Sequence, residues 1–151
     1  MNEDSYFDDQ FGGFPLDPFA AADASLPGVL AVLEARDAMR RSDHVSALAS
    51  LARARAGGIP VELVPHASVL EGAALTLTGE AAAAVTLLTD AWRNHPDIAM
   101  LPAALGAAQF AAGETTASAR SLFAALASED PDASLVVHRP LLTQLLRVMS
   151  R

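Results

Sequence analysis

The chain has 151 residues, which suits one domain with a modest hydrophobic core. Hydrophobic residues make up 52 % and aromatic residues only 5 %, and Ala, the strongest intrinsic helix former, is the commonest residue. The net charge of −8 and the absence of a stripe among the ten Arg argue against nucleic-acid binding, and the lack of Cys excludes disulfide and thiol chemistry.

Residues 1–26 form an acidic N-terminal tail that precedes a helical domain predicted for 27–151. The tail holds six carboxylates and no Arg, and its Gly and Pro residues leave too little continuous apolar surface for independent folding. Three alternatives follow: a disordered solubilising tail, an acidic-aromatic recognition segment, or a segment that docks on the chain's own domain and competes with a partner. The aromatic residues that motivate the last two are Tyr6, Phe7, Phe11, Phe14 and Phe19.

The N-terminus lacks the basic and then apolar pattern of a secretion signal. The longest uncharged run, 98–113, is too short for a membrane span and contains Pro102. We therefore expect a cytoplasmic protein without membrane insertion.

From Pro27 onward, Pro and Gly separate segments whose apolar residues recur at helical spacing, and no segment alternates as a strand would. Asp43 is expected to cap the second helix, Pro102 to lie in the first turn of the fifth, and Thr115 or Thr116 to cap the sixth. The sequence thus predicts an all-α chain of about seven helices, with approximate bounds 27–41, 43–56, 65–78, 80–94, 98–112, 116–128 and 139–150.

A pattern of small, bulky and Pro residues recurs along these helices. The glycine pair recurs after about 34 residues, and the Ala and bulky residues recur after one residue more. A fainter copy of the pattern lies slightly more than one period upstream. This alignment places one extra residue in the third copy, after Gly113. The copies are Ala35, Ser42, Ala47, Leu51, Ala54, Pro60; Gly72, Gly79, Ala84, Leu88, Ala91, Pro96; and Gly106, Gly113, Ala119, Phe123, Leu126, Pro131.

On these residues, 28–131 resembles three tetratricopeptide repeats, the helix–turn–helix units of a superhelical stack. The resemblance implies close helix approach where Gly72 meets Ala84 and Gly106 meets Ala119, and contacts with the next hairpin at the following bulky position. It also implies that the helix over 139–150 caps the open end of the stack. The large aromatic residues usual in the first helix of each repeat are missing.

The resemblance further implies a concave groove lined by the first helix of each hairpin. The groove positions are mostly apolar, so they favour an apolar or amphipathic segment of a partner protein over a carboxylate clamped by basic residues. The residues expected there are Val32, Arg36, Met39, His66, Val69, Thr76, Leu77, Ala103 and Phe110.

We therefore expect a non-enzymatic adaptor or chaperone that holds a protein partner. Its format also resembles small bacterial secretion chaperones for translocator or needle subunits, and regulation through the acidic tail is a third hypothesis. A homodimer, or the tail itself, could cover the groove. No catalytic, cofactor or metal site is expected, because the histidines lie in separate segments without ligand spacing: His44, His66, His95 and His138.

Overall fold

The computed structural model describes residues 18–128, 135 and 137–150, so Tyr6, Phe7, Phe11 and Phe14 lie outside it. The described residues form seven α-helices and one short 3-10 helix, with no strand among them, which confirms the all-α prediction. No helix in this part of the chain is long and apolar enough to cross a membrane. The elements are α2 (Pro27–Arg40), α3 (His44–Gly57), η1 (Val61–Leu63), α4 (Val64–Leu77), α5 (Ala81–Asn94), α6 (Met100–Ala111), α7 (Thr115–Leu126) and α9 (Arg139–Met149).

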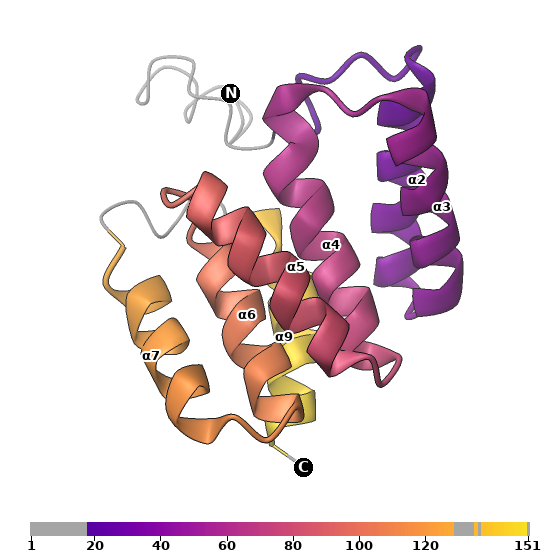
Figure 1. The fold of residues 1–151 in the computed structure, drawn as a ribbon. Helices are drawn as coiled ribbons and strands as arrows, with labels where there is room; N and C mark the ends of the chain where they lie inside the picture. The colour runs from indigo at the N-terminus through magenta and orange to yellow at the C-terminus, as the bar shows by residue number, and fades with distance from the viewer. Residues whose placement is uncertain (1–17, 129–134, 136, 151) are drawn as a thin grey trace, which may run out of the picture.

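Six of the helices form three successive hairpins, α2/α3, α4/α5 and α6/α7, which stack side by side (Figure 1). Most of their ends lie close to the positions expected from local signals. The Asp43 carboxylate caps α3 by accepting a hydrogen bond from the Ser46 amide at 3.2 Å, as predicted. The prediction of a Thr cap on α7 is wrong: Glu114 precedes the helix without a side-chain cap bond, and Thr115 is its first residue.

The three hairpins turn in the same way. The residue at each turn has a positive φ, 59° at Ser42, 90° at Gly79 and 85° at Gly113. The next amide then donates a hydrogen bond of 2.8 Å to a carbonyl near the end of the first helix, from Asp43 to Ala38, from Glu80 to Leu75 and from Glu114 to Gln109. This left-handed ending satisfies carbonyls that the first helix would otherwise leave unpaired.

Ser42 occupies this left-handed position at a steric penalty that glycine avoids. Ser42→Gly is therefore expected to raise the free energy of unfolding by up to about 1 kcal/mol, since relief of the φ strain exceeds the added entropy of the unfolded chain. Urea unfolding at constant m-value measures the change. Gly79→Ser is the matched reverse variant and should lower stability. A loss of stability on Ser42→Gly would contradict the strain at this turn.

Close approach within the hairpins depends on glycine. A Cβ atom added to Gly72 would lie 2.5–2.6 Å from three side-chain carbons of Leu88, and one added to Gly106 would lie 2.8 Å from Cγ of Leu122. The glycine and the leucine are separated by the same number of residues in both pairs. Gly72 and Gly106 are therefore as far apart in the sequence as Leu88 and Leu122. The second and third hairpins therefore repeat at one constant period, without an extra residue.

This spacing corrects the predicted alignment of α7 by one position. Ser118 and Ala125 are buried there, whereas Ala119 is exposed, Phe123 is 74 % exposed and Leu126 is 76 % exposed. The prediction that Ala119 packs against Gly106 is wrong, and so is the one that Phe123 contacts a further hairpin. The Ser118 hydroxyl lies in the core because it donates a hydrogen bond of 2.7 Å to the carbonyl of Gly106.

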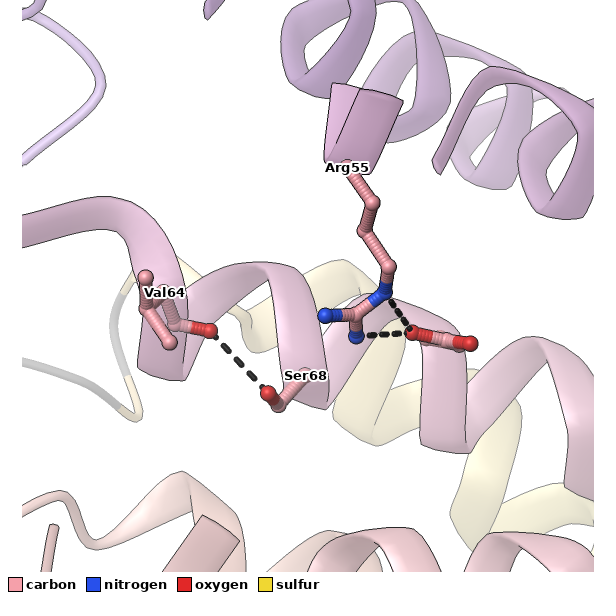
Figure 2. A network of polar contacts seen from close by, with 4 residues as sticks. Arg55, Val64 and Ser68 are labelled. Carbon is pink, nitrogen blue, oxygen red and sulfur yellow. Dashed lines mark hydrogen bonds and ion pairs between the residues drawn. The ribbon is translucent and has the colours of Figure 1, made fainter. Parts of the chain in front are cut away.

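The first and second hairpins are joined by an ion pair as well as by packing. The guanidinium of Arg55 in α3 donates to the carboxylate of Glu71 in α4, and Figure 2 shows Arg55 reaching across to that helix. Nearby, the Ser68 hydroxyl donates to the carbonyl of Val64 at 3.1 Å within α4 (Figure 2). The exposure of the ion pair limits its contribution to about 1 kcal/mol or less, so packing holds the hairpins together.

The last helix does not cap the stack, which corrects the sequence-based expectation. Instead α9 packs mainly against α6 and also contacts α4 and α2. Those three are the first helices of the hairpins. The outer face of α7 consequently keeps Phe123 and Leu126 exposed.

Candidate functional site

The first helices α2, α4 and α6 together present one surface, which we call the inner face. It corresponds to the groove expected from the sequence, and α9 lies across it; in Figure 1 α9 is the yellow helix behind α6. An amphipathic helix from the same chain therefore occupies the surface on which a partner was expected.

The residues expected to line the groove have three different environments. Arg36 and Leu77 are half-buried, and Phe110 is exposed at 38 %. Phe110 lies one repeat after Thr76, the buried residue at the matching point of the preceding hairpin. Phe110 is thus the one large side chain of the set that solvent reaches readily. The buried members are Val32, Met39, His66, Val69, Thr76 and Ala103.

α9 contacts the inner face through leucines spaced one helical turn apart. Leu141 and Leu145 are 5 % and 1 % exposed, and Leu142 and Met149 are partly buried against the same core. Leu141 and Leu145 are the only fully buried residues of α9, whereas α6 buries nine residues and α4 ten. α9 therefore buries fewer residues than any other of the seven described α-helices, although α5 and α7 bury only three each.

One amide orients α9 on the inner face. Nε2 of Gln144 donates a hydrogen bond of 2.9 Å to the carbonyl of Met39, in the last turn of α2. The other end of that amide, Oε1, is buried without a hydrogen-bond partner among the described residues. Beside it is a cavity of about 20 Å³ between Arg36, Met39 and Leu70 on one side and Leu141 on the other. A cavity of this size has room for about one water molecule.

A buried pair of histidines joins the start of α9 to α4. Nδ1 of His66 and Nε2 of His138 lie 2.8 Å apart and share one hydrogen bond, with the ring planes 20° apart and the centroids separated by 5.1 Å. The Phe19 ring is steeply inclined to both imidazoles, with its centroid 5.6 Å from that of His66 and 6.1 Å from that of His138. Phe19 is 3 % exposed, so this residue of the predicted tail belongs to the core of the helical domain.

The electrostatics of this cluster keep His138 neutral. The pKa of His138 is lowered from 6.5 to about 3, chiefly by burial and then by the neighbouring His66 and the Arg36 guanidinium. The Arg36 guanidinium also lies 5.0 Å from the centroid of the Phe19 ring, in a cation–π contact. The cluster joins Phe19, α2, α4 and α9, and its contacts favour the neutral form of His138.

Within residues 18–128 and 137–150, no three acidic or histidine side chains gather closely enough to hold a metal ion. His44 and His95 remain apart, at the ends of α3 and α5. His66 and His138 use their facing nitrogens on each other. The contacts that α9 makes with the inner face are apolar burial and single hydrogen bonds.

No family model matches the chain, and no similar protein was found among curated proteins or solved structures.

The sequence contained a signal for the position of α9 that spacing alone could not resolve. Its leucines at 141, 142, 145 and 146 predict one apolar face, and such a face fits either the open end of the stack or the inner face. The contributions of Gln144 and His138 could not be predicted, because each depends on a partner in a distant hairpin, Met39 or His66.

Proposed function

We propose that this protein is a non-enzymatic protein-binding module, an adaptor or chaperone of the tetratricopeptide-repeat type, which takes an amphipathic helix of a partner on its inner face. The observation that carries the proposal is α9 itself. A helix with two buried leucines one turn apart already lies across α2, α4 and α6. A surface that accepts such a helix in cis has the shape and polarity to accept one in trans.

The repeat geometry adds support. The glycine contacts of the second and third hairpins recur at a spacing of about 34 residues, and their first helices end in the same left-handed turn, as helix–turn–helix repeats require. The binding energy would come from apolar burial, since the inner face carries few charges. The affinity should therefore depend only weakly on salt, in contrast to an interaction led by the acidic N-terminal residues.

Phe110→Glu tests the proposal. We expect the substitution to weaken partner binding at least about 30-fold, because it replaces an accessible apolar anchor with a charge that binding would desolvate. The melting temperature should change little, since Phe110 is 38 % exposed. The measurement is quantitative capture of proteins from a lysate of the native host, followed by titration of the captured partner.

Phe123→Glu is the matched control, because Phe123 is an exposed aromatic residue on α7, away from the inner face. It should leave capture unchanged. Loss of capture with Phe123→Glu and not with Phe110→Glu would reject the inner face as the binding site.

A further inference from the structure

α9 is held on the inner face by two leucines, the Gln144 amide and the His66–His138 pair at its start. Of the seven described α-helices it has the fewest buried residues, Leu141 and Leu145, against three each in α5 and α7. The amide that orients it leaves Oε1 of Gln144 buried without a hydrogen-bond partner among the described residues, beside the small cavity. The contacts between the hairpins, α3 with α4 and α5 with α6, do not involve α9.

Most residues of the buried core belong to the three hairpins, and α9 adds Leu141 and Leu145 to it. α6 buries an uninterrupted run, Met100–Ala108, and packs against α7, α5 and α4. Val32 and Val69 on the inner face are fully buried. The inner face is thus a surface of a packed stack on which α9 is laid.

We infer that α9 is an exchangeable occupant of the inner face, replaced on binding by a partner helix that carries two leucines one helical turn apart and an amide one position before the second leucine. This inference rests on the proposed function. It specifies the kind of partner helix and states that α9 regulates partner binding by competing for the inner face. The leucines take the places of Leu141 and Leu145, and the amide takes the place of Gln144 and donates to the Met39 carbonyl. Because α9 is tethered, its effective concentration is high, and it lowers the apparent affinity for any helix presented in trans.

The first experiment uses the full chain and a fluorescent synthetic peptide with the sequence of residues 137–150. A full-length Leu141→Glu/Leu145→Glu variant, in which α9 cannot occupy the inner face, is expected to bind the peptide at least about ten times more tightly than the wild-type chain. The same peptide with both leucines changed to Glu should not bind. A peptide with Gln144→Ala should bind about five times more weakly, since it lacks one hydrogen bond. Equal binding by variant and wild type, or no binding by a variant with native helicity, would overturn the inference.

The second experiment needs no substitution, and it decides the matter if the double variant does not fold. Hydrogen exchange of the wild-type chain should show α9 amides exchanging at least about ten times faster than those of α4 and α6, because α9 opens while the hairpins remain folded. Excess peptide should accelerate exchange in α9 and leave α4 protected. Exchange of α9 at the rate of the most protected α6 amides would make it an integral part of the core and refute its replacement.

The two proposals fail in different ways. If Phe110→Glu leaves partner capture intact while the peptide displaces α9, the protein-binding site lies elsewhere and the exchange of α9 stands. If Phe110→Glu abolishes capture while α9 exchanges only with global unfolding, the partner binds beside a fixed α9 and the exchange is rejected.

Discussion

Gly72→Ala is expected to lower the free energy of unfolding by about 1–3 kcal/mol, although alanine favours a helix over glycine. The added methyl would lie 2.5–2.6 Å from Cγ, Cδ1 and Cδ2 of Leu88. Leu88 is fully buried in the core, so it has no free space into which to move. For a chain of this length the melting temperature should fall by about 3–10 °C, as measured by circular dichroism or calorimetry.

Gly106→Ala is the matched control for this prediction. Its added methyl would meet Leu122 at 2.8–2.9 Å, but Leu122 is only partly buried and can shift toward solvent. The loss of stability should therefore be smaller than that of Gly72→Ala. A double-mutant cycle with Leu88→Ala gives the direct test, because removal of the Leu88 side chain should abolish most of the penalty of Gly72→Ala. An undiminished penalty in the Leu88→Ala background would show that the strain has another source.

Acidification from pH 7 to pH 5 is expected to lower the free energy of unfolding by about 2 kcal/mol through His138 alone. In the folded chain the pKa of His138 is about 3, against 6.5 for an unperturbed histidine. The unfolded chain therefore binds more protons between pH 6.5 and pH 3, and stability falls as the pH drops through this interval. The stability contributed by the neutral imidazole is complete above pH 6.5. Urea unfolding at the two pH values measures the difference.

Among the described residues, His66 of α4, Arg36 of α2 and the ring of Phe19 lie against the His138 imidazole, and the Arg36 cation opposes its protonation. His138→Gln removes the titrating group and should reduce the pH dependence to less than half of its wild-type size. Nuclear magnetic resonance should show the His138 ring still neutral at pH 5. A full wild-type pH dependence in His138→Gln would assign the effect to another group.

Local signals in the chain were enough to predict the fold class and the approximate bounds of the helices. Pro27 begins α2, Asp43 caps α3, and Gly79 and Gly113 end first helices, because each of these signals acts through the backbone within a few residues. The glycine required for close approach in each of the last two hairpins was also predictable. A glycine that recurs inside a helix at the repeat length indicates a position where a neighbouring helix leaves no room for a side chain.

The residue of α7 that faces Gly106 was not predictable in this way. Ser118 and Ala119 are adjacent small residues, and composition favours the apolar one for the core. The folded chain buries Ser118 instead, because its hydroxyl finds the Gly106 carbonyl across the hairpin. A hydrogen bond to a distant backbone atom makes a polar residue suitable for the interior. The residues around Ser118 do not indicate that such an acceptor will lie nearby in the fold.

The position of α9 likewise depended on long-range packing. The apolar face of α9 specified that this helix must be buried. It could lie at the open end of the stack or on the inner face. The shape and hydrogen-bonding groups of these surfaces, which are assembled from three separate hairpins, decided between the two. The Met39 carbonyl and His66 provide partners for Gln144 and His138 on the inner face. Burial of apolar surface is non-directional, so an amphipathic helix predicts that a contact will form, whereas long-range packing selects where it forms.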